Sequence, residues 1–259
     1  MIQNATERTT GYALTKNATK AVNGKPVILF GEPYYQIENS DAIPPFFMSI
    51  VSSADHWLFI SSNGGLSAGR VSAEQALFPY YTEDKITDNN DNTGSKTILW
   101  VTRDNRVGLW EPFTARQHGQ YDLRQNLYKN VPGTALVFEE INLSLGLRVR
   151  YAWCTGEKFG FVKTTWIKNI SSSDEDLQLE LLDGLQNILP ANVSSSTQNT
   201  LSCLVDAYKR SELDIETGLG IFALNSTLTD LAEPSESLLA TTVFQVGLAQ
   251  TEHLLSSTQ

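Results

Sequence analysis

Short runs of apolar and β-branched residues, separated by turn-forming residues, dominate the chain. Strands in folded domains are commonly this short, and clusters of Gly, Pro, Asn, Asp and Ser bound them. The breaks between the middle runs are short and polar, which predicts antiparallel hairpins, because parallel pairing would need long crossover connections. The pattern predicts strands at residues 26–30, 46–51, 56–62, 96–103, 134–143, 145–154, 159–169, 177–183, 219–226 and 240–249.

Two of these runs show the clearest alternation. Leu147, Val149, Tyr151 and Trp153 alternate with arginines, which is the period of a strand with one apolar face and one wet face. Residues 177–181 alternate leucine with Gln and Glu in the same way. We therefore expect one face of each strand to lie in the core.

One segment departs from this pattern. In residues 197–213, Leu201, Leu204, Val205 and Tyr208 fall at i, i+3, i+4 and i+7, and this spacing predicts a helix with one apolar face. The sequence as a whole predicts an all-β fold with minor α content, namely an antiparallel, layered β-sandwich.

The domain organisation follows from the same pattern. Residues 1–25 are polar and predict an N-terminal extension, and residues 26–259 predict a single β domain without a linker long enough to divide it. The chain stops directly after a predicted strand, at Gln259. We therefore expect a fragment whose domain is truncated at its C-terminal end.

Composition excludes several classes of function. The formal net charge of −10 argues against nucleic-acid binding, which needs a basic face to release counterions. Neither a long apolar run nor a signal peptide is visible, so we expect a cytoplasmic protein without a membrane partner. Cys154 and Cys203 are expected to be reduced in that compartment. The histidines lie far apart and no metal-ligand spacing is visible, so neither a metal nor a cofactor is expected.

A glycine-rich stretch has the spacing of a phosphate-binding Walker loop, with Gly64, Gly69 and then Arg70. That loop needs a lysine after the second glycine and then a hydroxyl that binds magnesium. Val71 cannot supply this hydroxyl, so the sequence argues against a nucleotide site. The Asn-Gly-Gly sequence at residues 63–65 instead predicts the turn of a hairpin that follows a strand.

Four stretches occur in an order that resembles the N-terminal β-supersandwich domain of the cellobiose and chitobiose phosphorylase family, with this chain as a divergent member. They are SSNGGLSAGR at residues 61–70, KTILWVTRDNRVGLWEPF at 96–113, ARQHGQYDLR at 115–124 and WIKNISSSDEDLQLELLD at 166–183. The resemblance spans about residues 46–190 and implies a fold like that of galactose mutarotase. It also implies that catalysis belongs to a following (α/α)6 barrel, so no catalytic residue is carried over to this chain.

The resemblance leads to a functional expectation. The chain is expected to be the non-catalytic N-terminal domain of a glycoside phosphorylase, a glycosyltransferase or a glycoside hydrolase, and to be inactive alone. Its expected partners are a sugar or oligosaccharide, the barrel of the same parent chain, and a second copy in a homodimer. The alternative is a free-standing sugar-binding or aldose epimerase-like protein, for which His56, His118 and either Glu111 or Glu140 are the available acid and base groups.

Candidate ligand or interdomain residues are aromatic and charged side chains beside the glycine-rich stretch and the His-Gly turn. An aromatic ring beside polar groups can present one face to a sugar while hydrogen bonds form around it. The candidates are Arg70, Tyr80, Tyr81, Glu83, Trp110, His118 and Tyr121.

Paired carboxylates could serve as catalytic groups, but we expect these pairs to be solvated surface residues, because charged residues are mostly exposed. Glu139 and Glu140 are neighbours on a predicted strand, so their side chains are expected to point to opposite faces. The pair Glu83 and Asp84 and the acidic run at residues 174–176 are interpreted in the same way.

Overall fold

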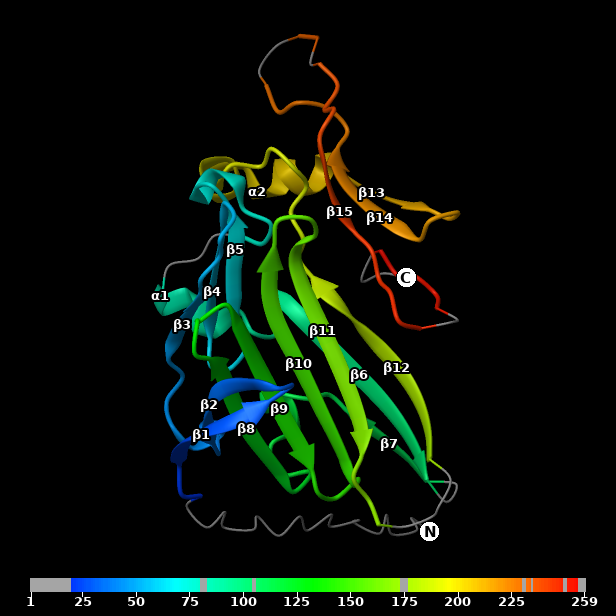
Figure 1. The fold of residues 1–259 in the computed structure, drawn as a ribbon. Helices are drawn as coiled ribbons and strands as arrows, with labels where there is room; N and C mark the ends of the chain where they lie inside the picture. Colours follow the sequence, from blue (N-terminus) through cyan, green and yellow to red (C-terminus); the bar gives the residue numbers. More distant parts are fainter. Residues whose placement is uncertain are drawn as a thin grey trace, which may run out of the picture.

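The computed structural model describes residues 20–79, 83–103, 106–172, 177–229, 232–233, 235–248 and 251–255. Within this part of the chain, the largest sheet has six antiparallel strands. In spatial order they are β1 (Asn23–Leu29), β2 (Glu32–Glu38), β8 (Leu123–Asn130), β9 (Ala135–Asn142), β10 (Leu147–Gly156) and β11 (Gly160–Asn169). The arrangement is shown in Figure 1.

Two smaller sheets form a second layer against one face of the six-stranded sheet, which we call the inner face. One of them is β3 (Phe47–Ile50), β4 (His56–Ser61) and β5 (Leu66–Arg70). The other is β12 (Leu177–Gln186), β6 (Gly94–Arg103) and β7 (Arg106–Trp110). The connections carry α1 (Glu83–Ile86) and the 3-10 turns η1 (Ser40–Ala42), η2 (Ala73–Gln75), η3 (Thr87–Asn89) and η4 (Ala115–Gln117).

The core lies between these two layers. On the inner face, Leu147, Val149 and Trp153 are fully buried and Tyr151 is 3% exposed, which confirms the predicted alternation along β10. Their neighbours in the second layer come from β4 and β5 at one end and from β6 and β7 at the other. Phe113 packs against both of these core clusters and so links the two ends of the interior.

The hairpin β1–β2 lies across the opposite, outer face of the six-stranded sheet (Figure 1). Phe30 and Gly31 form its two-residue turn, and both have positive φ, as the twist of a tight hairpin requires. This turn carries Phe30 to Trp166 of β11, where the two rings stack at 4.7 Å. Beneath the hairpin, Tyr34 packs with Tyr128 in a small second core.

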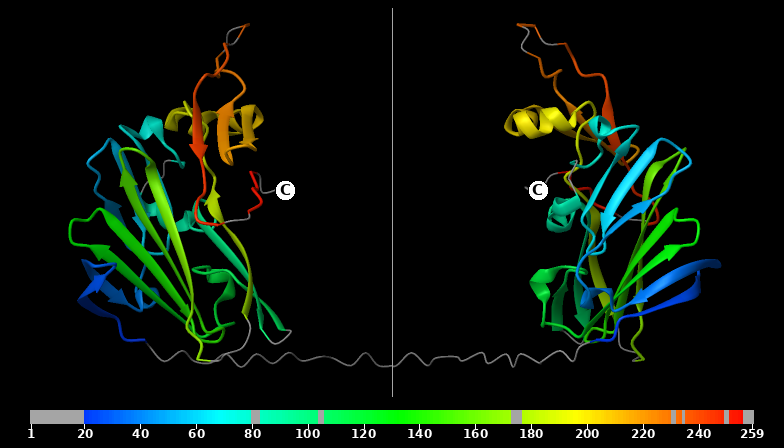
Figure 2. Two further views of the ribbon diagram at one scale, coloured as in Figure 1. Left: turned by 45° about the vertical axis from the view of Figure 1, so that its right-hand side comes forward. Right: turned by 90° about the vertical axis from the view of Figure 1, so that its left-hand side faces the viewer.

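A C-terminal subregion lies at one end of the two layers (Figure 2). It contains α2 (Ser195–Tyr208) and a sheet of β13 (Lys209–Asp214), β14 (Leu219–Leu224) and β15 (Ala240–Val243). The Ser194 hydroxyl caps α2 by accepting a hydrogen bond from the Thr197 amide at 3.0 Å. The predicted apolar stripe is covered only in part, because Leu201 has non-helical dihedrals and is 46% exposed, whereas Val205 is 3% exposed.

The predicted all-β class with one longer helix is confirmed, and each predicted strand overlaps a strand of the structure. The expectation that the alternating leucines of residues 177–181 lie in the core was wrong for Leu179 and Leu181, which are each 37% exposed on the edge strand β12. The expected helical segment was too long, because its last residues form β13. β1 begins at Asn23, three residues before the predicted strand, and β2, β5, β7, β8 and β13 lie outside the strand ranges predicted from the apolar pattern. Both cysteines are free, and no helix in the described ranges is long and apolar enough to cross a membrane.

Candidate functional site

The residues that the sequence suggested for a site have different surroundings in the structure. Arg70 ends β5 and is exposed, and His118 is exposed in the turn after η4. Tyr121 is half-buried, and its hydroxyl donates a hydrogen bond to the Leu109 carbonyl at 2.7 Å. Tyr80 and Tyr81 lie outside the described residues, as does the side chain of Glu83.

Trp110 is fully buried in the core between β6, β7 and β10 and has no exposed ring face for a ligand. Its indole Nε1 donates to Glu140 Oε1 at 2.8 Å, so its polar atom is also occupied. This corrects the expectation that Trp110 contacts a sugar. A large aromatic at a core-facing strand position is buried unless the opposite layer leaves an opening.

Glu139 and Glu140 point to opposite faces of β9, as the strand period predicts, but the expectation that they are solvated was wrong. They are 2% and 1% exposed. Glu140 lies on the inner face and accepts hydrogen bonds from Trp110, from the Phe113 amide at 2.9 Å and from Gln125 at 2.6 Å. Burial raises the pKa of Glu140, although the three donors act in the opposite direction.

On the outer face, the Glu139 carboxylate accepts hydrogen bonds from Arg150 Nε at 2.5 Å, Asn126 Nδ2 at 2.7 Å and the Tyr128 hydroxyl at 2.7 Å. Arg148 Nε lies at 3.7 Å from the same carboxylate. A buried carboxylate is tolerated when charged and neutral donors occupy its oxygens in this way. Both glutamates are therefore structural groups of the sheet.

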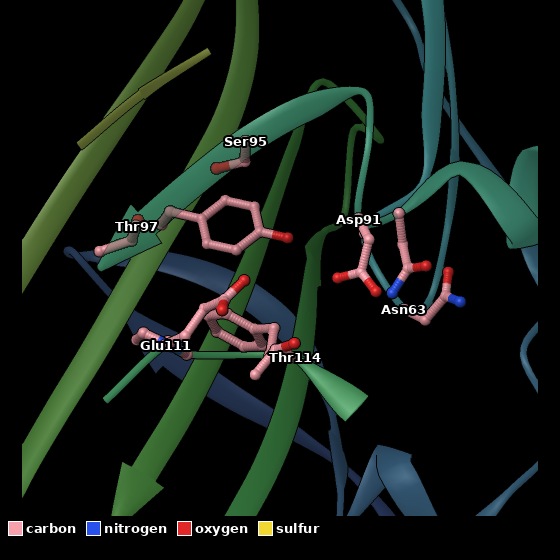
Figure 3. A pocket seen from close by; sticks show the side chains of 11 residues that line it. Asn63, Asp91, Ser95, Thr97, Glu111 and Thr114 are labelled. Atoms are coloured by element: carbon pink, nitrogen blue, oxygen red, sulfur yellow. The ribbon is translucent and has the colours of Figure 1, made fainter. Parts of the chain in front are cut away.

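A small polar cavity lies under the predicted Asn-Gly-Gly turn, which the structure confirms as the connection of the β4–β5 hairpin. Figure 3 shows Asn63 and Asp91 on one side of it, and Ser95, Thr97, Glu111 and Thr114 on the other. Its volume is about 30 Å3, which is room for about one or two ordered waters or one hydroxyl group. The full lining is Asn63, Gly64, Asn90, Asp91, Ser95, Thr97, Glu111, Pro112, Phe113, Thr114 and Tyr151.

Two carboxylates of this cavity are already held by cations. Glu111 pairs with Lys96 and with Arg116 Nη2, the latter at 3.0 Å. The same Arg116 nitrogen lies 3.3 Å from Asp91, so it bridges the two acidic groups across the cavity rim. The charges of the cavity are therefore largely compensated, and its free hydrogen-bonding capacity belongs to neutral groups.

The Tyr151 hydroxyl is a neutral group of this cavity with unused hydrogen-bonding capacity. Tyr151 is 3% exposed, and within the described part of the chain its hydroxyl makes no hydrogen bond. Burial raises the pKa of Tyr151 further above its usual value, so the hydroxyl keeps its proton. Ser95 Oγ is a second buried oxygen without a partner among the described residues.

The glycines of the hairpin turn allow its backbone to come close to the Tyr151 hydroxyl. A Cβ at Gly64 would lie 2.9 Å from the Tyr151 hydroxyl, and Gly64 has φ of +95°. A Cβ at Gly65 would lie 1.9 Å from the Ile86 carbonyl oxygen. The turn therefore needs glycine so that the backbone can close over the cavity and over the helical connection next to it.

A larger apolar hollow of about 440 Å3 is lined by residues of β2, β3 and β8. Tyr35, Ile37, Met48 and Leu127 contribute to its walls, and Lys129 is the charged residue of its lining. Recognition of a sugar needs several polar groups that converge on the ligand. The polar cavity under the hairpin turn is therefore the better candidate for contact with a sugar hydroxyl.

The acid and base groups considered for epimerase chemistry do not meet in the described part of the chain. The His56 ring packs edge-on against Phe161 at 5.0 Å, and burial, followed by the charge of Arg70, lowers the pKa of His56. His118 is exposed, and neither histidine has a carboxylate within ion-pair distance among the described residues.

The described residues contain no cluster of three or more His, Cys, Asp or Glu side chains that could hold a metal ion. The chemistry of the cavity is therefore that of neutral hydrogen-bonding groups and compensated carboxylates. Sequence reasoning found the turn above the cavity but missed Tyr151 and Ser95 as its lining. Comparison of the chain with protein-family models and with curated proteins finds no match in either set.

Proposed function

We propose that the chain is a non-catalytic β-sandwich domain of a larger carbohydrate-active enzyme that resembles the inverting glycoside phosphorylases. In this proposal the fold is a supersandwich of the galactose mutarotase type. A separate (α/α)6 barrel of the same parent chain supplies the catalytic groups. The domain packs against that barrel, takes part in a homodimer, and contributes a subsite for sugar.

The observation that carries the proposal is an open apolar strip on the outward-facing side of sheet β12–β6–β7. Trp100 is 40% exposed, Leu109 46% and Val107 69%. Trp100 and Leu109 are cross-strand partners, so their side chains lie next to each other on one face. Exposed apolar side chains that gather on one sheet face mark interaction surfaces, and we assign this strip to the barrel.

The cavity under the hairpin turn supports the sugar-binding part of the proposal. It is too small for a sugar ring, so we assign it to a single hydroxyl group, with the Tyr151 hydroxyl as donor. The ion-paired carboxylates beside it, Glu111 and Asp91, fix the shape of the rim.

The proposal predicts that the gene continues past Gln259 into helix-rich sequence. The full protein is expected to release a sugar 1-phosphate from a β-linked disaccharide and inorganic phosphate, whereas residues 1–259 alone are expected to be inactive. A reading frame that stops at Gln259 would refute the proposal that the chain is part of a larger enzyme. Acceleration of α-glucose mutarotation by residues 1–259 would favour an epimerase-like protein instead.

The packing surface can be tested in the full protein. Trp100→Ser is expected to lower its melting temperature and to weaken the contact between the domains, because it removes the largest side chain of the strip. Leu143→Ser is the matched control, since Leu143 is also 40% exposed but lies outside the strip. Equal melting temperatures for the two variants would contradict the assignment of the strip to the barrel.

A further inference from the structure

Three cations lie in one row across the outer face of the six-stranded sheet. The strand register pairs Arg124 of β8 with Ile141 of β9, Ile141 with Arg148 of β10, and Arg148 with Lys168 of β11. Cross-strand partners share a face and are separated by about 4.8 Å per strand. Arg148 and Lys168 are therefore direct neighbours, and Arg124 lies two strands away.

The adjacent row brings a fourth cation and an aromatic platform. It runs from Asn126 through Glu139 and Arg150 to Trp166. Trp166 is 37% exposed and stacks on Phe30, which is 53% exposed at the tip of the β1–β2 hairpin. In Figure 1 the hairpin crosses this face, and the lower ends of β9, β10 and β11 extend beyond it.

The charges of this face do not balance. Glu139 is shared by Arg150 and Arg148, while Arg124 and Lys168 are exposed and have no ion pair among the described residues. Across β8 to β11 this face thus carries four cations against the one buried carboxylate of Glu139, in a chain with a formal net charge of −10.

Other acidic groups near this face are few in the described ranges. Glu32 and Glu38 of β2 share this face, and Lys25 holds Glu38 and lowers the pKa of Glu38 through its hydrogen bond. Asp122 is exposed two residues before Arg124. The acidic residues 174–176 lie outside the described residues. Like charges that lie directly opposite each other on neighbouring strands destabilise a sheet, so Arg148 and Lys168 favour an anion between them.

We propose that this outer face binds an acidic oligosaccharide, with carboxylates at Arg124, Arg148 and Lys168 and a sugar ring against the Phe30–Trp166 pair. Guanidinium groups match carboxylates in a bidentate geometry, and an exposed aromatic face accepts the apolar side of a sugar ring. The aromatic pair beside the cations favours a saccharide over an acidic peptide. The proposal does not rest on the phosphorylase-like function proposed above.

The test is calorimetric titration of the chain with tetragalacturonate and with maltotetraose, a neutral tetramer of the same length. Tetragalacturonate is expected to bind at least about tenfold more tightly, and its affinity is expected to fall as salt screens the exposed cations. The variants Arg124→Gln and Lys168→Gln are each expected to lower the affinity for tetragalacturonate by about three- to tenfold. Lys209→Gln, which removes an exposed cation from β13, is the matched control and is expected to change nothing.

Phe30→Leu tests the aromatic platform, because it keeps an apolar contact with Trp166 but removes one ring. It is expected to weaken tetragalacturonate binding by about threefold or more, with an unchanged melting temperature as the check on folding. Equal binding of the two tetramers, or binding of neither, would overturn the proposal. So would tetraglutamate binding as tightly as tetragalacturonate without an effect of Phe30→Leu, which would indicate an acidic protein partner.

Discussion

The two faces of β9 bury adjacent carboxylates in different ways. On the outer face, Glu139 accepts a hydrogen bond from Arg150 and lies near Arg148, so the partners of its carboxylate include two positively charged side chains. On the inner face, Glu140 is held by neutral donors, namely the indole of Trp110, an amide of the backbone and the amide of Gln125. The exposed fractions of the two glutamates are almost equal, so burial alone does not decide their properties.

The difference teaches how each layer tolerates a buried anion. A charged partner offsets the cost of moving a carboxylate out of water, but it also leaves a second buried charge that depends on it. Neutral donors create no such dependence, and the carboxylate can take up a proton when its charged form is too costly. The outer face is therefore sensitive to the loss of a partner, and the inner face is sensitive to pH.

The largest effect is expected from Glu139→Ala. The change leaves Arg150, whose side chain is 16% exposed, without its carboxylate, and it removes the acceptor of the Tyr128 hydroxyl. We expect a loss of about 3–5 kcal/mol in the free energy of unfolding, measured by urea denaturation. The control is Glu212→Ala at an exposed ion pair with Arg210, which is expected to change little. Similar losses for both variants would show that Glu139 is not a buried partner.

A smaller, pH-dependent effect is expected from Glu140→Gln. The folded-state pKa of Glu140 is raised, so the wild-type carboxyl contributes most below its unfolded pKa of about 4.3. This contribution is lost as pH rises through the folded pKa. The variant has no titratable group at this position. At low pH we expect its free energy of unfolding to be about 1 kcal/mol below that of the wild-type protein, because an N–H of the introduced amide faces other hydrogen-bond donors. Unfolding curves between about pH 4 and pH 8 should therefore show the difference from wild type narrowing as pH rises.

The contrast in pH response is what distinguishes the two faces. If the gap between Glu140→Gln and the wild-type protein stays constant over this range, Glu140 does not titrate with a raised pKa. The neutral hydrogen bonds would then stabilise its charge as effectively as the arginines stabilise that of Glu139.

The strand period in the sequence correctly placed the two glutamates on opposite faces, but it could not predict that both are buried. Their burial depends on the second layer on one side and on the β1–β2 hairpin on the other, which are contacts between distant residues. β8 was missed for a related reason: Gln125 occupies a core-facing position because it donates to Glu140, and this breaks the apolar alternation.

The candidate cavity shows the same limit. The sequence Asn-Gly-Gly predicted a hairpin turn, and the alternation along β10 placed Tyr151 in the core, so both parts were visible separately. The contact between the turn and Tyr151 could not be predicted, because the close approach of Gly64 to the Tyr151 hydroxyl joins β10 to a hairpin far away in the sequence. Local patterns carry propensities and periods, whereas contacts between sheets depend on the register and stacking of whole layers.

The smallest effect is expected from Tyr151→Phe, and its matched partner on the outer face is Tyr128→Phe. The Tyr128 hydroxyl donates to Glu139 and accepts from Gln36 at 3.1 Å, so its removal should cost about 1–3 kcal/mol by leaving buried groups unpaired. The Tyr151 hydroxyl bonds to no described residue, so its removal should leave the urea midpoint almost unchanged. An equally destabilised Tyr151→Phe would mean that the cavity of the free protein already contains an ordered partner, such as a water molecule. The hydroxyl would then not be available to a sugar without displacing that partner.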